Sequence, residues 1–157
     1  MPTRAYIGLG ANLGQARETI EHAIEALRRT PGINAVRVAP HYGSDPVDAT
    51  GPTFVNTVVE VETTLEPLAC LDVLQSIENA HGRERPFQNA PRTLDLDLLW
   101  YEGVTMHTPR LILPHPRMHQ RAFVLRPLRD LIEDLPLKHG SLDALLDECC
   151  DQKVWRL

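Results

Sequence analysis

The spacing of apolar residues along the chain predicts a regular succession of strands and helices. Runs rich in β-branched or other apolar residues predict strands over residues 4–9, 33–41, 54–62 and 94–101. Apolar residues that recur at helical spacing predict helices over residues 15–29 and from Pro67 to Gly82, with shorter ones near 121–132 and 141–149. The glycines of residues 8–14 indicate a turn, and residues 42–53 read as a loop.

The order strand, helix, strand, strand, helix, strand is that of the split βαβ arrangement. It predicts an α+β fold, in which an antiparallel-containing sheet has helices packed on one face. The strands over residues 54–62 and 94–101 are expected to be central. A chain of 157 residues, 43% of them hydrophobic, suits a single domain over residues 1–157.

Composition narrows the class of protein. The net charge of −5 argues against general nucleic-acid binding. Without a membrane-length apolar run or a secretory leader, a cytoplasmic protein with no membrane partner is expected. The odd number of cysteines favours reduced thiols. Residues 103–129 hold five arginines and no acidic residue, which fits either a site for a small polyanion or a solvated basic face.

Two carboxylates on one predicted strand are the first candidates for chemistry. Strand alternation directs Asp95 and Asp97 to one face and four residues into the core on the other: Leu94, Leu96, Leu98 and Trp100. Adjacent carboxylates repel each other unless a cation compensates, and Mg²⁺ commonly takes one or two carboxylates plus substrate phosphates. The alternative is a solvated amphipathic strand with Arg92 as counter-ion.

Basic residues before and after this strand favour the metal interpretation. Residues 81–92 carry three arginines before the pair and show no hydrophobic periodicity. Arginine binds phosphate oxygens bidentately, and phosphoryl transfer needs little beyond positioning, metal ions and cationic groups. Two prolines hold His115 in an extended backbone, ahead of Arg117 and Arg121. Either segment alone also fits an ordinary surface loop, but together with the aspartates they predict a magnesium-dependent kinase of a small alcohol.

Five blocks of sequence occur in a characteristic order: Gly10-x-Asn12-Leu13-Gly14, Phe54-Val55-Asn56, Gly82-Arg83-x-Arg85, Ala90-Pro91-Arg92-Thr93-Leu94-Asp95-Leu96-Asp97 and Pro114-His115-x-x-Met118-x-x-Arg121-x-Phe123. Together they resemble the 6-hydroxymethyl-7,8-dihydropterin pyrophosphokinase family of bacterial folate biosynthesis. The resemblance implies a ferredoxin-like α+β sandwich, a mainly antiparallel sheet with helices packed on its faces. It implies transfer of the β,γ-diphosphate of ATP to the pterin hydroxymethyl group, with AMP as the second product.

The resemblance also implies roles for individual residues. Asp95 and Asp97 would hold two Mg²⁺ ions, and Asp97 would act in catalysis with Arg83 and Arg92, which close on the triphosphate. The residues implied for the nucleotide are Gln75, Glu78, Arg85, Arg110, Ile112, His115 and Arg121. Those implied for the pterin are Ser44, Val47, Phe54, Asn56 and Phe123. The implied partners are the small molecules ATP and 6-hydroxymethyl-7,8-dihydropterin, and a monomer is expected.

The chain departs from the family pattern at three positions. Members commonly carry Trp where this chain has Asn89, with Phe87 two residues earlier. Pro116 and Phe54 stand where Tyr is common. Two other classes of protein remain open: an anion-binding regulatory module of ferredoxin-like fold, and a nucleotidyl transferase, which also uses paired aspartates but releases pyrophosphate.

Overall fold

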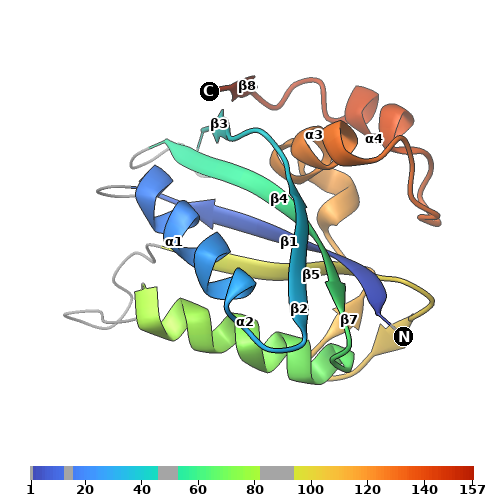
Figure 1. The fold of residues 1–157 in the computed structure, drawn as a ribbon. Helices are drawn as coiled ribbons and strands as arrows, with labels where there is room; N and C mark the ends of the chain where they lie inside the picture. Colours follow the sequence, from blue (N-terminus) through green and yellow to red (C-terminus); the bar gives the residue numbers. More distant parts are fainter. Residues whose placement is uncertain (1, 13–15, 46–52, 82–93) are drawn as a thin grey trace.

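A computed structural model describes residues 2–12, 16–45, 53–81 and 94–157 (Figure 1). In chain order, its elements are β1 (Thr3–Ala11), α1 (Ala16–Arg28), β2 (Ile33–Val38), β3 (Tyr42–Ser44), β4 (Phe54–Thr63), α2 (Pro67–His81), β5 (Asp95–Tyr101), β6 (Met106–His107), β7 (Ile112–Leu113), the 3₁₀ turn η1 (Met118–Gln120), α3 (Ala122–Leu131), α4 (Leu142–Glu148) and β8 (Val154–Arg156). In these ranges no helix is both long enough and apolar enough to cross a membrane.

Six strands form an antiparallel sheet in the order β5–β1–β4–β3–β8, and β2 also pairs with β4. β2 and β3 follow one another along β4, with Val38 opposite Val59 and Tyr42 opposite Asn56. The prediction of a central strand was right for β4 and wrong for residues 94–101. β1 is central instead, because it pairs with both β4 and β5, and β5 ends this order of strands.

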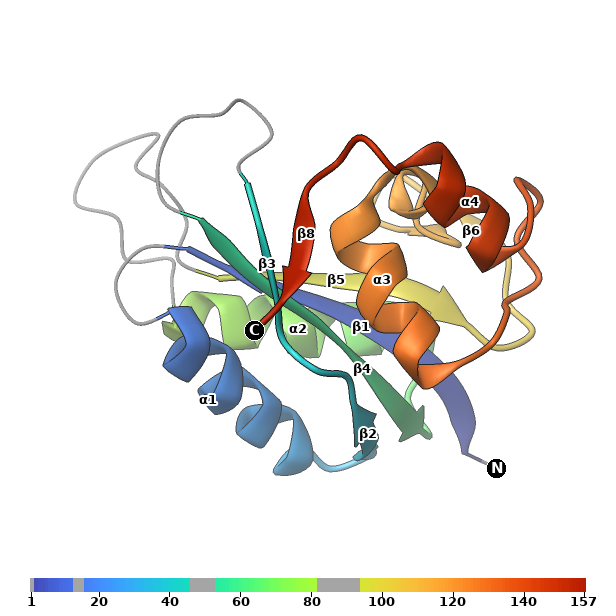
Figure 2. The same ribbon diagram turned by 90° about the horizontal axis from the view of Figure 1, so that it is seen from above.

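Helices lie on both faces of the sheet (Figures 1 and 2). α1 and α2 cover one face, where Ile20 and Leu74 pack with Ile7 of β1. α3 and α4 cover part of the other face, where Leu128 and Leu142 pack around Tyr6. The element order alone predicted helices on one face. The second layer is formed by the two shorter predicted helices, which follow the last strand of that order.

Four short strands were absent from the sequence prediction. β3 lies in the loop predicted over residues 42–53, β8 lies after the last predicted helix, and β6 and β7 form a separate two-stranded sheet after β5. Each is two or three residues long, too short for a strand period to be visible. β3 depends on contacts with distant residues, since Gly43 lies opposite Trp155 of β8. A Cβ at Gly43 would lie 2.6 Å from the Trp155 ring, so this pairing requires glycine.

A register shift in β5 changes which side chains enter which core. Tyr6 lies opposite Trp100 and Ile7 opposite Leu98, so Leu99 is an extra residue in β5. Leu99 and Trp100 therefore both pack with the α3–α4 core. The prediction that Trp100 shares the face of Leu98 is wrong. The alternation holds before the shift, and it leaves Asp95 and Asp97 on the face away from α1 and α2.

Candidate active site

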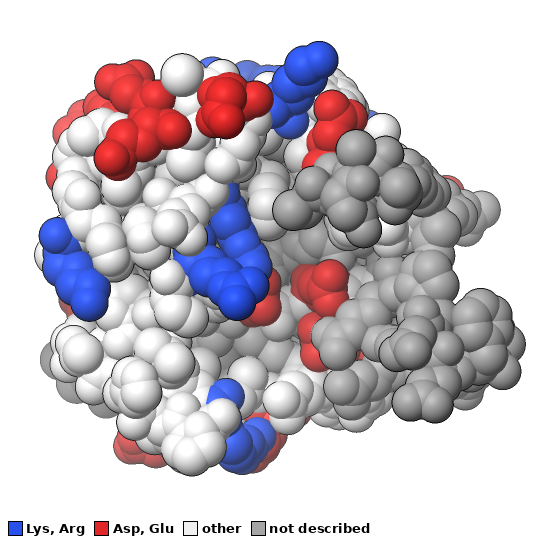
Figure 3. Space-filling model, turned by 180° about the vertical axis from the view of Figure 1, so that it is seen from behind, with Lys and Arg blue, Asp and Glu red and all other residues white. Residues whose placement is uncertain are grey.

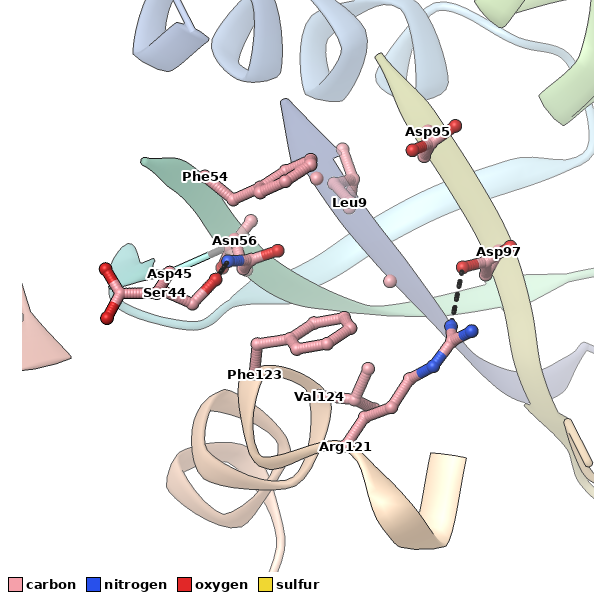
Figure 4. Close-up of a pocket in the computed structure, with 13 residues that line it drawn as sticks. Leu9, Ser44, Asp45, Phe54, Asn56, Asp95, Asp97, Arg121, Phe123 and Val124 are labelled. Atoms are coloured by element: carbon pink, nitrogen blue, oxygen red, sulfur yellow. Dashed lines mark hydrogen bonds and ion pairs between the residues drawn. The ribbon is translucent and has the colours of Figure 1, made fainter. Parts of the chain in front are cut away.

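A pocket of about 180 Å³ opens where β1, β4 and β5 meet the beginning of α3 (Figure 4). Its wall on one side is the start of β5, with Asp95 and Asp97. Its opposite wall is formed by β3, β4 and the first turn of α3. The pocket therefore joins segments that are far apart in the sequence, and it includes residues from four of the five blocks described above.

The floor of the pocket is β1, where two glycines replace side chains. Gly8 lies opposite Asp97, and Gly10 lies opposite Asp95 on one side and Asn56 on the other. A Cβ at Gly10 would lie 3.1 Å from Asn56 Oδ1, which is closer than an ordinary contact. Gly8 lies within the strand predicted over residues 4–9, but the predicted turn is wrong for Gly10, because β1 continues to Ala11. A glycine inside a strand pattern is itself a sign of such a close approach.

Asp95 and Asp97 point to the same side of β5 and toward the pocket, and both are half-buried (Figure 4). They present carboxylate oxygens, which are the ligands that Mg²⁺ prefers. Among the described residues no group of three or more His, Cys, Asp or Glu side chains could hold a metal ion. Two carboxylates are nevertheless a sufficient protein contribution for Mg²⁺ when substrate phosphates complete its coordination. The donor set therefore fits magnesium.

The opposite wall combines aromatic rings with a buried amide. Phe54 of β4 and Phe123 of α3 lie on either side of the pocket, and Asn56 lies between them (Figure 4). Asn56 is only 4% exposed, and its Nδ2 donates a hydrogen bond of 2.7 Å to Ser44 Oγ. This bond fixes the orientation of the amide. The arrangement suits a flat heterocycle with hydrogen-bonding groups on one edge.

Arg121 connects the two walls. It is the N-cap residue of α3, and its Nη1 lies 3.8 Å from Asp97 Oδ2. Its guanidinium carbon lies 5.6 Å from the centre of the Phe123 ring, within the range of a cation–π contact. The space-filling view from behind shows a hollow where acidic and basic side chains meet (Figure 3). A cation held beside a carboxylate pair at an open pocket can bind a phosphate group that enters with a metal ion.

His115 lies outside this pocket, in the segment that leads to η1. Its backbone N–H donates to Leu99 O at 2.8 Å, which fixes the segment against β5. Burial lowers the pKa of His115, as do Arg121 and Arg117, whereas Asp97 opposes them. The ring is therefore neutral near pH 7. Its Nδ1 accepts the Arg117 N–H at 3.1 Å, so the proton of the neutral ring is on Nε2, where it is available to a phosphate oxygen.

Four residues predicted for the nucleotide lie on or near α2 and β7, away from the pocket. Arg110 Nη2 donates to Gln75 Oε1 at 3.3 Å and forms an ion pair with Asp72, so it is held against α2. Ile112 is in β7. Glu78 is 8% exposed, and its Oε2 accepts the N–H of Leu96 at 2.8 Å. Because Leu96 lies between the two aspartates, Glu78 fixes the backbone that carries them.

The structure thus brings seven of the predicted residues into one pocket: Ser44, Phe54, Asn56, Asp95, Asp97, Arg121 and Phe123. Val47, Arg83, Arg85 and Arg92, together with Phe87 and Asn89, lie outside the described residues. Sequence reasoning missed six other residues that line the pocket: Gly8, Leu9, Gly10, Asp45, Thr57 and Val124. Of these, the two strand glycines carried a usable signal.

Comparison with known proteins identifies the family. The family model described as 7,8-dihydro-6-hydroxymethylpterin-pyrophosphokinase (HPPK) matches residues 6–133. The chain belongs to this family. A 2-amino-4-hydroxy-6-hydroxymethyldihydropteridine pyrophosphokinase of Pseudomonas aeruginosa is 46% identical over 159 residues, with 100% of this chain and 98% of the relative covered. The protein of the same name from Bacillus subtilis is 38% identical over 141 residues, with 89% and 84% covered.

Solved structures agree with the HPPK fold. A crystal structure of an HPPK-DHPS in complex with substrates matches with a TM-score of 0.75 at 13% identity, covering 94% of this chain and 43% of that chain. At this identity the match shows the fold alone, and this chain spans less than half of that longer protein. The α+β class and the HPPK family predicted from the sequence are confirmed. So is the predicted reaction class, pyrophosphoryl transfer to a hydroxymethyl dihydropterin in folate biosynthesis.

Proposed function

We propose that this chain transfers the β,γ-diphosphate of ATP to the hydroxymethyl group of 6-hydroxymethyl-7,8-dihydropterin and releases AMP. One observation carries the proposal in full. A single pocket has a carboxylate pair on one side and, on the other, a buried amide between two aromatic rings (Figure 4). The carboxylates suit metal-bound phosphates, and the amide and rings suit a pterin.

The pterin would lie between Phe54 and Phe123, because aromatic rings stack well on a flat heterocycle. Asn56 would then read the polar edge of the ring, and its bond to Ser44 keeps the amide in one orientation. Val47 is proposed to add an apolar contact. With the polar edge on Asn56, the opposite edge of the pterin would face β5, which directs the hydroxymethyl group toward the aspartates.

Asp95 and Asp97 would hold Mg²⁺, and we propose two ions, each shared with ATP phosphates. Bound magnesium would neutralise the charge that develops on the phosphate oxygens. Arg121 is held beside Asp97 and would bind phosphate from the side of α3. His115 would donate Nε2–H to a phosphate oxygen. Glu78 would hold the backbone between the two aspartates in place through Leu96.

The reaction is an in-line attack of the pterin hydroxymethyl oxygen on the β-phosphorus of ATP. The new bond joins that oxygen to the β-phosphorus, while the bond from the β-phosphorus to the oxygen it shares with the α-phosphorus breaks. AMP leaves with that oxygen. We assign the proton of the hydroxyl group to Asp97, whose carboxylate lies on this wall of the pocket.

Other parts of the nucleotide are assigned to neighbouring residues. Gln75, Arg110 and Ile112 would contact the nucleoside, since Arg110 is held against Gln75 of α2 and lies just before β7, which contains Ile112. Arg83, Arg85 and Arg92 are proposed to close on the triphosphate and to exclude water, which would prevent hydrolysis of ATP.

The core of the fold supports a ferredoxin-like assignment. The first, second, fourth and fifth strands alternate with α1 and α2 in the order of the split βαβ arrangement. These four strands lie in the order β5–β1–β4–β2, with both helices on one face. We propose that β3, β8, α3 and α4 are additions to this core, and that they build the pterin side of the pocket.

The product of ATP tests the proposal. The protein is incubated with ATP, Mg²⁺ and the reduced hydroxymethyl pterin, and the nucleotide product is identified by chromatography. We expect AMP that forms only when the pterin is present. Release of pyrophosphate would indicate a nucleotidyl transferase instead. Unchanged ATP would indicate a binding module, and AMP formed equally without pterin would also contradict the proposal.

A further inference from the structure

The last residues of the chain contact both sides of the pterin half of the pocket. We call residues 152–157 the C-terminal brace. Its strand β8 pairs with β3, placing Val154 opposite Ser44 and Trp155 opposite Gly43 (Figure 2). The N–H of Leu157 extends this pairing by donating to His41 O at 3.0 Å. The brace therefore holds the strand that orients Asn56 through Ser44.

The other end of the brace holds the first turn of α3. Gln152 Oε1 accepts the backbone N–H of Ala122 at 2.9 Å, and its Nε2 donates to Gln120 O at 2.8 Å. The first N–H groups of a helix have no partner within the helix and need an external acceptor. Arg121 is the N-cap residue, yet its side chain makes no capping bond. Gln152 supplies the cap from a part of the chain 30 residues away.

This cap matters because the pocket wall formed by α3 also borders a second cavity. An open space of about 610 Å³ shares Ser44, Asp45, Arg121 and Phe123 with the first pocket and has Gln152 among its lining residues. Arg121 and Phe123 thus each border two cavities, while Phe123 also packs against the α3–α4 core. Their positions depend on the backbone at residues 120–122, to which Gln152 bonds on either side of Arg121.

We infer that Gln152 is a positioning residue for the pterin subsite, which fixes the distance of Phe123 and Arg121 from Asn56 by capping α3. The inference rests on the proposed function, because it takes the pocket as the pterin site. Gln152 acts through the helix backbone and does not touch the reacting atoms. Losing a helix cap typically changes an equilibrium by about five-fold, and we expect an effect of this size on pterin binding.

The test is Gln152→Met, which keeps the volume of the side chain and removes both hydrogen bonds. Its matched control is Gln120→Met, because Gln120 contacts Gln152 only through its backbone oxygen, which the substitution retains. Two quantities are measured at 25 °C: the KM for the hydroxymethyl pterin, and the amide hydrogen exchange rate of the first turn of α3. We expect Gln152→Met to raise the KM by about five-fold and to speed exchange by a similar factor.

Rescue distinguishes positioning from stability. Gln152→Glu retains an acceptor for the Ala122 N–H, so we expect it to recover most of the pterin KM. Faster exchange with an unchanged KM would mean that the cap is structural only, and would overturn the inference. So would a KM change of equal size in Gln120→Met. The wild-type reaction in the same assay separates the two proposals. If the wild type forms no AMP, the proposed function is contradicted. If the wild type turns over and Gln152→Met has the wild-type KM for the pterin, only the positioning role is contradicted.

Discussion

A buried carboxylate at the centre of the sheet gives the most direct test of the energetics. Glu60 of β4 lies opposite Tyr6 of β1 and Arg37 of β2, so the three side chains form a row across the sheet. Glu60 Oε1 accepts from the Tyr6 hydroxyl at 2.8 Å and from Arg37 Nη2 at 2.7 Å. Arg37 also donates to Leu131 O at 2.6 Å, which ties the end of α3 to the sheet.

Replacing Arg37 with alanine removes the cation from this row. Burial raises the pKa of Glu60, but the bonds from Arg37 and Tyr6 outweigh burial and hold it below its ordinary value. Without Arg37 we expect burial to dominate and the pKa to lie above that value. Breaking a buried pair costs about 3–5 kcal/mol. The Arg37 side chain is 51% exposed and that of Glu60 is 5% exposed, so solvent screens part of the pair.

We therefore expect Arg37→Ala to lower the free energy of unfolding by about 2 kcal/mol at pH 7. For a chain of this size, that corresponds to a fall in Tm of about 4–8 °C. Urea unfolding followed by circular dichroism measures the change. The control is Arg28→Ala: Arg28 lies 3.7 Å from Glu25 with both side chains half-exposed. Such a surface pair contributes about 0.5 kcal/mol or less.

The stability difference between the wild type and Arg37→Ala should depend on pH. In the wild type, the contribution of Glu60 is present above the ordinary carboxyl pKa and is lost as the pH falls through its lower folded pKa. In Arg37→Ala the folded pKa is raised, so acidification stabilises the folded variant. The difference in stability between the two proteins should therefore narrow from about pH 7 to about pH 4. A difference that stays constant, or an Arg37→Ala loss no larger than that of Arg28→Ala, would refute this reasoning.

Three further predictions concern the site. Asp97→Ala should lower the rate of AMP formation by about a thousand-fold or more while the circular dichroism spectrum is unchanged, because Asp97 is proposed to hold magnesium; retained activity would exclude that role. Arg92→Ala should lower kcat more than it weakens nucleotide binding measured by calorimetry, and a purely weaker affinity would show that this arginine serves binding. In Gly10→Ala, the new Cβ would lie 3.1 Å from Asn56 Oδ1 and displace the amide. We expect the pterin KM to rise by about ten-fold. Nucleotide affinity serves as the internal control and should not change.

Apolar spacing predicted the long elements well, since each buries a continuous stripe that shows its period. The helix expected to start at Pro67 does so, and the strand over residues 54–62 is β4. Features that depend on distant partners were missed. The shift at Leu99 arises from pairing with β1, and β3 needs both β4 and Trp155. The single domain, the monomeric state and the cytoplasmic location stay predictions.

The candidate site shows the same division between local and distant information. Sequence blocks gave the residue types that carry the chemistry, such as Asp95, Asp97 and Asn56, because their order along the chain is specific. The residues that set the distances between these side chains lie outside those blocks or were assigned to the wrong element. Gly10 was assigned to a turn, although its missing side chain lets β1 approach Asn56. Gln152 carries no recognisable pattern, because a cap supplied from a distant residue leaves no periodic trace.

The contrast between the β5 wall and the α3 wall predicts where substitutions can change pterin affinity and still leave diphosphate transfer intact. Substitutions in β5 would alter the carboxylates themselves, and Glu78 limits the freedom of that backbone through Leu96. The α3 wall is different, since it also borders a second cavity and its first turn is held by Gln152. The pterin half of the pocket should therefore be the more adjustable one, and the C-terminal brace is the part of the fold through which sequence changes would adjust it.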